Sequence, residues 1–293
     1  MDTKILNGSP VADKILDNLR IRSSNLKRVG VIPKLLIIRV GDKDNDNSYE
    51  KSILKHAIEY GIRVDVEKFD TNVSQSEIIN EIIRANKNNS VDAIMIFRPL
   101  PDHLNEREIA SKISPDKDVD GISPLNLGKT FESYEDSFVP CTSKSVIEIL
   151  ESIDFQFEGA DVLIVGRSLV VGRPLGMLFL QKDSTVGIAH SKTLNLKNLT
   201  KGSDVVVTTL GKPKFFDDSY FSENSIIIDV GVSLDEDGNL SGDVDFDKVN
   251  GKVKAITPVP GGVGALTTAV LLDHVVKACE NNRLKRMDEF RLI

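Results

Sequence analysis

A glycine-containing turn follows one of the most apolar runs of the chain. Asp161–Val165 is typical of a buried strand and leads directly into Gly166-Arg167-Ser168-Leu169-Val170-Val171-Gly172-Arg173-Pro174, after which a helical pattern begins. Glycine permits a sharp turn and proline suits a first helical turn, so free backbone N–H groups and a helix N-terminus would face a phosphate. The spacing differs from G-x-G-x-x-G, so an ordinary strand–helix turn remains the alternative. The pattern predicts cofactor contacts from Gly166, Arg167, Ser168, Gly172 and Arg173.

Basic and hydroxyl side chains follow the next strand-like run, Ser184–Ala189. In a doubly wound sheet, the end of this strand lies beside the adenosine ribose of a bound dinucleotide. An acidic residue there would bind the 2′-hydroxyl, whereas a basic and hydroxyl-rich pocket accommodates a 2′-phosphate. His190, Ser191 and Lys192 stand at this position, and together with Arg167 they predict NADP rather than NAD. On its own, His190 would be read as a strand-end residue with a satisfied imidazole.

Three further loops have the composition of ligand loops. Gly211 and the pair Val230-Gly231 follow strand-like runs where a nicotinamide is expected, although ordinary turns would use the same glycines. Thr257–Gly264 combines two prolines, which fix φ near about −65°, with three glycines, which allow close backbone approach. It predicts a stiff loop in front of a helix, with an ordinary Pro/Gly turn as the alternative.

The N-terminal half carries the remaining candidates for chemistry in Gly41–Lys55, Phe97–Pro101 and Asp116–Gly121. Asp120 could hold a donor-rich heterocycle such as a pterin, because a carboxylate accepts paired N–H bonds well. The alternative is an Asp-rich surface turn, which is the commoner use of such a string.

Strand-length hydrophobic runs alternate with amphipathic runs, which favours βαβ units and mainly parallel sheets. A polar, aperiodic stretch between Gly121 and Val139 is typical of a domain connection. We expect an α/β fold of two lobes, with domains at 1–138 and 139–270 and a C-terminal helix at 271–293 that packs back on the first domain. Helices that begin near Thr142 and Thr267 are expected to join the lobes. Strands are expected at Lys34–Val40, Arg63–Phe69, Ala93–Phe97, Asp161–Val165, Ser184–Ala189, Asp204–Thr208 and Ser225–Val230, and helices at Asn47–Tyr60, Ser74–Asn86, Ser143–Ile153 and Pro174–Gln181.

The composition excludes several classes of partner. The 293 residues carry a formal net charge of −7, which argues against nucleic acid or an anionic membrane as the main partner. Cys141 and Cys279 lack the spacing of a metal or redox site, so we expect buried thiols in a reducing cytosol and no metal ion. No apolar run is long enough to span a bilayer, and the N-terminus lacks a signal-peptide core. We therefore expect a cytoplasmic protein.

In their order along the chain, these motifs resemble the methylenetetrahydrofolate dehydrogenase/methenyltetrahydrofolate cyclohydrolase family, the FolD-type bifunctional enzymes of one-carbon metabolism. The resemblance runs from the N-terminal helix to about Cys279. The matching pieces are Val40-Gly41-Asp42 leading to Tyr49, Pro99-Leu100-Pro101, Lys117–Gly121, Pro140-Cys141-Thr142, Gly166-Arg167-Ser168, Val171–Pro174, His190–Thr193, Gly242-Asp243-Val244 and Pro258–Gly264.

The resemblance implies a homodimer of two-lobed α/β chains, with a folate-binding catalytic domain at 1–138 and a Rossmann-like NAD(P)-binding domain at 139–270. It implies NADP-dependent oxidation of 5,10-methylenetetrahydrofolate to 5,10-methenyltetrahydrofolate, hydrolysis of the latter to 10-formyltetrahydrofolate, and a link to purine biosynthesis. Carried over by position, Tyr49 would stack on the aminobenzoyl ring and Asp120 would anchor the pterin. Arg167 and Ser191 would contact the 2′-phosphate. The cleft would also be lined by Pro99, Leu100, Pro260, Gly261 and Gly262.

The chain departs from the family pattern around Tyr49. The family usually has a lysine four residues later, where this chain has Ile53, and a glutamine before Pro-Leu-Pro, where it has Phe97. Arg98 replaces the usual leucine and brings a permanent charge that does not shuttle a proton. The usual serine three residues before the tyrosine is Asp46.

His56 is the candidate that could replace the missing lysine. At about 100° per residue, it returns to the face of Tyr49, whereas Lys51 and Lys55 lie on the opposite side. Histidine can act as an acid or base near neutral pH, although a histidine packed on a helix face is the commoner case. Tyr49, Asp120 and His56 are the catalytic candidates.

The two reactions make different demands on these residues. Hydride transfer depends largely on positioning, whereas hydrolysis needs an activated water and a moved proton. We therefore expect dehydrogenation to be retained and hydrolysis to be weak or absent. Two alternatives stay open, namely a divergent paralogue that oxidises another one-carbon or imine substrate and a non-catalytic folate- or nucleotide-binding subunit.

Overall fold

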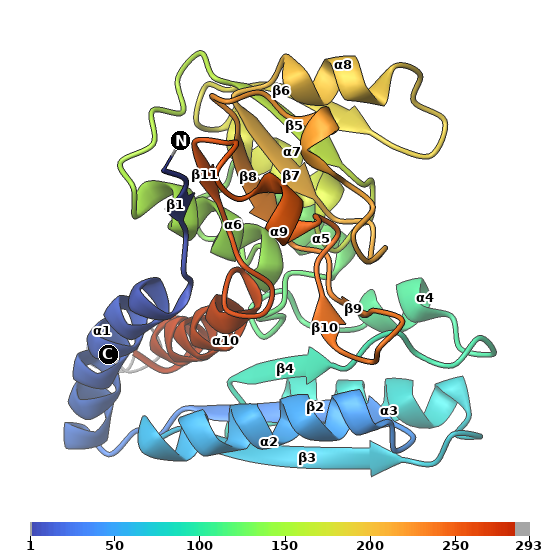
Figure 1. The fold of residues 1–293 in the computed structure, drawn as a ribbon. Helices are drawn as coiled ribbons and strands as arrows, with labels where there is room; N and C mark the ends of the chain where they lie inside the picture. The colour runs from blue at the N-terminus through green and yellow to red at the C-terminus, as the bar shows by residue number, and fades with distance from the viewer. Residues whose placement is uncertain (1, 285–293) are drawn as a thin grey trace. The chain divides into compact units, whose positions relative to one another are not determined.

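The computed structural model describes residues 2–284. The chain forms two compact units, and the predicted fold class is confirmed because both are α/β (Figure 1). The six-stranded unit comprises the described residues up to Asp13 together with Pro140–Thr267. The three-stranded unit comprises Lys14–Val139 and the described residues from Thr268 onward.

The six-stranded unit has one parallel sheet in the order β1-β11-β8-β7-β5-β6. Its central strands are near-continuous apolar runs, as expected for parallel strands covered on both faces. The chain order reverses at β5, with β6 on one side and β7 on the other, which is where open α/β sheets bind ligands at their carboxyl edge. The strands are β1 (Lys4–Ile5), β5 (Asp161–Val165), β6 (Thr185–Ala189), β7 (Val205–Thr208), β8 (Ile226–Asp229) and β11 (Ala255–Ile256).

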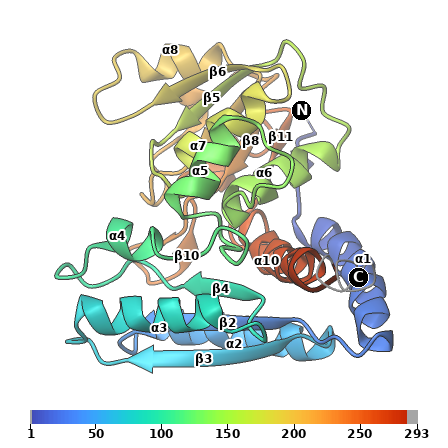
Figure 2. The same ribbon diagram turned by 180° about the vertical axis from the view of Figure 1, so that it is seen from behind.

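Short helices and one hairpin complete this unit. Helix α7 packs against β5 and β6, and α6 packs against α7 (Figure 2). Side chains of β5, β7 and β8 form a core with Phe216 and Phe221. The helices are α6 (Cys141–Glu151), α7 (Gly172–Leu180), α8 (Leu196–Lys201), the 3₁₀ turn η1 (Asp218–Tyr220) and α9 (Phe246–Val249), and β9 (Ser233–Leu234) pairs with β10 (Leu240–Ser241) in the hairpin.

The three-stranded unit has a parallel sheet in the order β3-β2-β4. Alternate residues of β2 face opposite sides, so Leu36, Ile38 and Val40 enter a core with α3, whereas Arg39 lies on the other face. Helix α3 begins with a capping box formed by Ser74 and Glu77. The elements are β2 (Lys34–Val40), α2 (Asp44–Glu59), β3 (Arg63–Phe69), α3 (Gln75–Lys87), β4 (Ala93–Ile96), α4 (Glu106–Ala110) and α5 (Pro124–Phe131).

Of the two helices expected to join the units, the one near Thr267 does so as α10 (Gly264–Cys279), and the one near Thr142 does not. The chain passes between the units within helix α1 (Ser9–Arg28), within helix α10 and at the Val139–Pro140 junction. The helix expected to join the lobes near Thr142 is α6, which lies wholly in the six-stranded unit. Residues 2–13, placed by the sequence in the 1–138 domain, belong to the six-stranded unit because β1 pairs with β11.

The C-terminal part of α10 and the π-helical turn η2 (Glu280–Leu284) belong to the three-stranded unit. Arg22 of α1 binds Glu280 through Nη2 at 2.7 Å, and His274 Nδ1 donates to the Val119 carbonyl at 2.8 Å. Residues 285–293 of the expected 271–293 segment lie outside the described residues. No helix within 2–284 is both long enough and apolar enough to cross a membrane.

Candidate active site

The folate residues predicted in the three-stranded unit are positioned by the carboxyl edge of its sheet. Strand β4 ends at Ile96 and delivers Phe97 and Arg98 to this edge. The segment that carries Asp120 runs beside β4, because Ile94 and Asp118 form a parallel bridge and the Ile94 amide donates to the Lys117 carbonyl at 2.7 Å. Two segments more than twenty residues apart in sequence are thus fixed side by side.

Helix α2 places Tyr49 and Ile53 at the same edge. The Tyr49 and Phe97 rings are in contact, with centroids 5.4 Å apart and planes tilted by 31°. Ile53, one turn after Tyr49, is fully buried, and Phe97 is 5% exposed. Where the family usually has a lysine and a glutamine, this chain therefore has two buried apolar side chains.

A buried arginine fixes helix α2 against the sheet. Arg39 of β2 is 1% exposed, and its Nε lies 2.7 Å from Oε2 of Glu50, the residue next to Tyr49. Its two Nη atoms donate to the Gly41 carbonyl at 3.1 Å and to Asn47 Oδ1 at 2.8 Å. Sequence reasoning missed this pair, and the signal that could have found it was one arginine in an otherwise apolar strand.

Asp120 is paired with the residue that departs from the family pattern. Arg98 Nη2 donates to Asp120 Oδ2 at 3.0 Å, and Arg98 Nη1 lies 3.6 Å from Glu106 Oε1. Both Arg98 and Asp120 are mostly buried. The charge of Arg98 is therefore balanced by the carboxylate predicted to anchor the pterin.

The neighbours of Asp120 have structural roles. Lys117 is 5% exposed, and its Nζ donates to three carbonyls at the end of α3 at 2.8–2.9 Å. Asp118 is fully buried and accepts the Ile122 and Ser123 amides at 3.1 and 2.8 Å. Burial raises the pKa of Asp118, and these hydrogen bonds oppose that rise. Lys117 and Asp118 thus form a buried frame next to Asp120, whereas Asp116, at the start of the Asp-rich string, is exposed.

The remaining predicted residues of this unit have simpler environments. His56 is half-buried on α2, and its Nδ1 donates to the Ser52 carbonyl at 2.8 Å, which leaves Nε2 as the acceptor nitrogen of a neutral ring. Pro99 is exposed and its carbonyl accepts Lys43 Nζ at 3.1 Å, whereas Leu100 is buried in the core.

The predicted cofactor turn lies at the point where the order of the six-stranded sheet reverses. Gly166 has φ 142°, and a side-chain carbon there would overlap the hydroxyl of Thr209 in the loop after β7. A side-chain carbon on Gly172 would overlap the Gly166 carbonyl. The backbones of the turn and of the first residue of α7 thus approach more closely than any residue with a side chain would allow.

The expectation of free N–H groups in this turn is wrong for three of them. Ser168 Oγ accepts the Val171 amide at 3.1 Å and the Gly172 amide at 3.5 Å, and the Ser168 carbonyl accepts the Arg173 amide at 3.0 Å. Ser168 therefore binds the first amides of α7 from within the loop. Serine side chains often accept nearby backbone amides in this way, but the sequence motif alone did not predict it.

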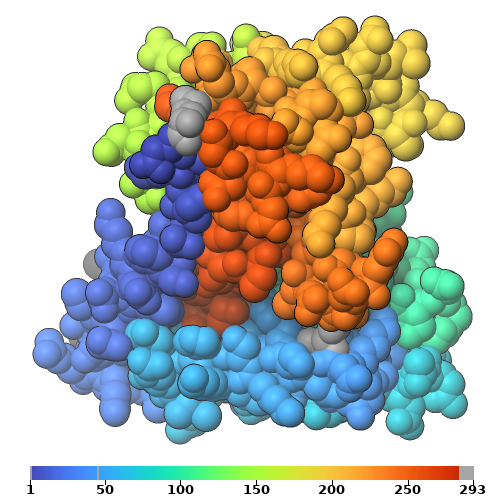
Figure 3. Space-filling view, in the orientation of Figure 1, coloured from blue at the N-terminus to red at the C-terminus, as the bar shows by residue number. Residues whose placement is uncertain are grey.

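The predicted adenosine pocket is brought together by backbone pairing. The Gly166 amide donates to the Ala189 carbonyl at 2.9 Å, so the turn with Arg167 lies beside the end of β6. Arg167 and Ser191 are exposed, and the yellow segment that contains helix α8 lies on the surface of the molecule (Figure 3). His190 Nδ1 accepts the Lys192 amide at 3.1 Å, which places the proton of a neutral ring on Nε2.

The predicted nicotinamide loops are held by two aspartates that sequence reasoning did not single out. Asp243 accepts the Leu210 and Lys212 amides at 2.5 and 2.7 Å, on either side of Gly211. Asp229 accepts the Gly231 amide at 3.1 Å, next to Val230. Burial raises the pKa of Asp229 to about 6 and also raises that of Asp243. Asp243 lies in the matching motif Gly242-Asp243-Val244, which was the available signal.

The proline–glycine loop packs on the N-terminal segment of the chain. The Gly8 amide donates to the Gly261 carbonyl at 2.8 Å, and a side-chain carbon on Gly8 would overlap the Gly262 carbonyl. Gly262 is buried and Pro260 is exposed. The loop is therefore held on one side by the chain itself, and its contact with folate stays a prediction.

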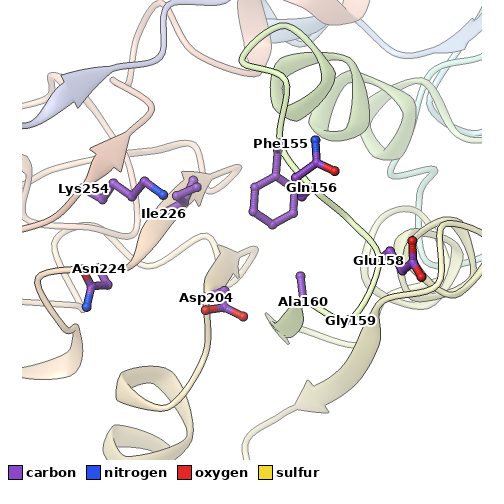
Figure 4. A pocket seen from close by; sticks show the side chains of 9 residues that line it. All are labelled: Phe155, Gln156, Glu158, Gly159, Ala160, Asp204, Asn224, Ile226 and Lys254. Carbon is purple, nitrogen blue, oxygen red and sulfur yellow. The ribbon is translucent and has the colours of Figure 1, made fainter.

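A hollow of about 390 Å³ lies away from all these residues. Segment 155–160 lines it together with Asp204, Asn224, Ile226 and Lys254, which lie at the amino ends of β7, β8 and β11 (Figure 4). Because α/β sheets bind ligands at the carboxyl edge, we do not assign it to the cofactor. Among residues 2–284, no cluster of three or more histidine, cysteine or acidic side chains could hold a metal ion.

Comparison with known proteins agrees with this arrangement. Residues 6–120 match the family model "Tetrahydrofolate dehydrogenase/cyclohydrolase, catalytic domain", and residues 140–283 match its "NAD(P)-binding domain". The chain is 47% identical to the "Bifunctional protein FolD" of Clostridium botulinum (strain Okra) over 96% of this chain and 99% of the relative.

Solved structures with the same fold include the FolD methylenetetrahydrofolate dehydrogenase/cyclohydrolase of Campylobacter jejuni, with TM-score 0.93, 36% identity, and coverage of 95% of this chain and 99% of that one. The Trypanosoma brucei N5,N10-methylenetetrahydrofolate dehydrogenase-cyclohydrolase, solved with NADP and an inhibitor, has TM-score 0.91 and 30% identity, and covers 96% of this chain and 98% of that one. The chain belongs to the tetrahydrofolate dehydrogenase/cyclohydrolase family.

Proposed function

We propose that this chain oxidises 5,10-methylenetetrahydrofolate to 5,10-methenyltetrahydrofolate with NADP⁺. The observation that carries the proposal is the carboxyl edge of the six-stranded sheet, where Gly166 and Gly172 form a close-packed turn and the Gly166 amide pairs with the Ala189 carbonyl, two residues before Ser191. Family membership supports the same activity.

The residues of the six-stranded unit fit NADP. Side-chain carbons are excluded at Gly166 and Gly172, which is typical of backbone that lies under a pyrophosphate. Arg167 offers a planar donor for a 2′-phosphate and Ser191 a hydroxyl, and both side chains are exposed. Bound NADP⁺ supplies the hydride acceptor. The chain contributes the binding and orientation on which hydride transfer mainly depends.

In the three-stranded unit, we propose that Tyr49 stacks on the substrate and that Asp120 anchors its pterin. Contact with Phe97 fixes the Tyr49 ring, and the Arg39–Glu50 pair fixes the helix that carries it. Asp120 is held by Arg98 and by the buried frame of Lys117 and Asp118. These residues orient the substrate without moving a proton.

The hydrolytic half of the family chemistry lacks its usual proton carrier. Position 53 is a fully buried isoleucine and position 97 a buried phenylalanine, so neither side chain can accept or donate a proton. His56 is the remaining ionisable candidate on α2, and its Nδ1 is already bonded to the Ser52 carbonyl. We propose that hydrolysis of methenyltetrahydrofolate is weak or absent.

Two assays on the purified chain test these proposals. With NADP⁺ and methylenetetrahydrofolate, reduced nicotinamide should appear with turnover, whereas folate binding without turnover would favour a non-catalytic subunit. Turnover with another one-carbon or imine substrate alone would favour a divergent paralogue. With methenyltetrahydrofolate as substrate, hydrolysis well above the uncatalysed rate would contradict the proposal that cyclohydrolase activity is weak or absent.

Arg167→Ala is expected to raise KM for NADP⁺ by about tenfold to a hundredfold and to leave KM for NAD⁺ within about twofold. The reason is that a charge-assisted hydrogen bond contributes about 1.5–3 kcal/mol and only NADP⁺ carries the 2′-phosphate. Initial-rate kinetics with both cofactors check this. Lys201→Ala, which removes an exposed charge on α8, is the matched control. Equal losses for both cofactors would contradict the role of Arg167.

We also propose that the chain acts in the cytoplasm as a homodimer and that its product feeds purine biosynthesis. The support is its family resemblance. Sedimentation equilibrium tests the dimer, and a monomer at working concentrations would contradict it.

A further inference from the structure

The loops after β7 and β8 run past the last ladder hydrogen bonds, which the Thr209 amide makes to the Val165 carbonyl and the Val230 amide to the Thr208 carbonyl, so the amides beyond them need other acceptors. The loop at Thr208–Lys212 contains Gly211, and the loop at Asp229–Gly231 contains Val230. Both residues are predicted cofactor contacts. Two buried carboxylates supply the missing acceptors. Asp243 is fully buried and Asp229 is 3% exposed.

Asp243 holds the loop after β7. Its Oδ2 accepts the Leu210 amide at 2.5 Å and its Oδ1 accepts the Lys212 amide at 2.7 Å. Both oxygens are therefore bonded to amides of one loop, and the backbone is fixed on either side of Gly211. Aspartate suits this task because an ionised carboxylate accepts several N–H bonds at once.

Asp229 holds the loop after β8 and also the segment that carries Asp243. Its Oδ1 accepts the Gly231 amide and the Asp243 amide, each at 3.1 Å, and its Oδ2 accepts the Val244 amide at 2.9 Å. The Thr208 hydroxyl donates to the same Oδ1 at 2.9 Å. The two carboxylates thus form one network that reaches from β7 through β8 to both loops.

The close packing around the network leaves no space for larger residues. A side-chain carbon on Gly231 would overlap the carboxylate of Asp243, and one on Gly242 would overlap the carboxylate of Asp229. Glycine at these two positions lets the backbone come close enough to donate, so the network is built by four residues together.

We propose that Asp229 and Asp243 are positioning residues for the nicotinamide half of the cofactor. The two carboxylates hold the loops in the shape that binds the nicotinamide, and they do not touch the cofactor themselves. The inference rests on the proposed NADP-dependent function and deepens it, because it separates the residues that shape the nicotinamide end from Arg167 and Ser191 at the adenosine end.

The charges around the pair agree with two ionised carboxylates held by donors. The amides of Gly231, Asp243 and Val244 and the hydroxyl of Thr208 all donate to the Asp229 carboxylate. The ammonium of Lys212 favours the ionised form of Asp243, whereas the charge of Asp243 disfavours ionisation of Asp229. Protonation of Asp229 would replace an accepted hydrogen bond by a clash between donors.

The experiment compares two ligands that differ at the nicotinamide end, namely NADPH and 2′-phospho-ADP-ribose. Equilibrium binding of both is measured for the full-length native chain, Asp243→Asn, Asp229→Asn and the control Asp247→Asn, whose carboxylate is exposed on α9. Asparagine keeps the size but removes one acceptor and adds a donor. We expect Asp243→Asn and Asp229→Asn to weaken NADPH binding about tenfold and 2′-phospho-ADP-ribose binding less than about threefold, with the control unchanged.

A second measurement needs no variant. In the native chain, the ratio of NADPH affinity to 2′-phospho-ADP-ribose affinity should fall as the pH is lowered from 7.5 to 5. Titration of the 2′-phosphate, which both ligands carry, affects both affinities and cancels in the ratio. A constant ratio, equal losses for the two ligands in the variants, or unchanged NADPH binding would each overturn the positioning role. A native chain that binds neither ligand would instead overturn the proposed function.

Discussion

Ile53→Lys combined with Phe97→Gln is expected to raise hydrolysis of methenyltetrahydrofolate at least tenfold above the native chain. General acid–base catalysis contributes about 10²–10⁴-fold in enzymes, and these two positions lie where this family usually has its lysine and glutamine. Position 53 faces inward one turn from Tyr49, whose ring contacts Phe97. An amide at position 97 would give the new ammonium a hydrogen-bond partner in this buried setting. A stopped assay of methenyltetrahydrofolate decay measures the gain.

The single variants separate chemistry from stability. Ile53→Lys alone places a charge in a fully buried apolar position, so we expect it to lower the free energy of unfolding by about 3–5 kcal/mol. Ile58→Lys is the matched control, because Ile58 lies on the same helix and is 77% exposed. It should leave the rate of hydrolysis unchanged and should change the free energy of unfolding by no more than about 0.5 kcal/mol. A folded double variant that binds folate but hydrolyses at the native rate would show that these positions do not explain the loss.

The sequence predicts the parallel strands well and the smallest strands poorly, for a physical reason. Lys34–Val40, Arg63–Phe69 and Asp161–Val165 are long apolar or alternating runs, and the structure has β2, β3 and β5 at the same residues. Strands β1 and β11 have two residues each and carry no periodicity. Only their pairing in space defines them, so the place of residues 2–13 could not follow from local pattern.

The same limit applies to the site. Motif order along the chain indicated Tyr49, Asp120 and Arg167, because these residue types belong to recognisable local strings. The Arg98–Asp120 pair spans 22 residues, and the hydrogen bond of Asp243 to the Leu210 amide spans 33. Contacts of this kind depend on which strand ends meet at one sheet edge. Sequence shows the residue types that could pair, whereas the fold decides the partners.

Replacement of Asp229 should remove a pH dependence from the stability of the chain. Burial raises the pKa of Asp229 from 3.8 to about 6 in the folded protein, so the folded state holds this proton more tightly than the unfolded state does. The resulting stabilisation is fully present below pH 3.8 and is lost as the pH rises through about 6. Between pH 7.5 and pH 5, this one group should add about 1.4 kcal/mol to the free energy of unfolding.

The measurement is urea unfolding of the native chain and of Asp229→Asn at both pH values. The free energy of unfolding of the native chain minus that of Asp229→Asn should be about 1.4 kcal/mol larger at pH 5 than at pH 7.5, because asparagine has no proton to bind. Asp247→Asn, which removes an exposed carboxylate, should show no comparable change. The affinity for NADPH should fall between pH 7.5 and pH 5, because the protonation of Asp229 that stabilises the fold removes a hydrogen-bond acceptor for the amides of the nicotinamide loops. A difference that is the same at pH 5 and pH 7.5 would mean that Asp229 titrates near its unfolded value and that its burial is offset by the amides of Gly231, Asp243 and Val244.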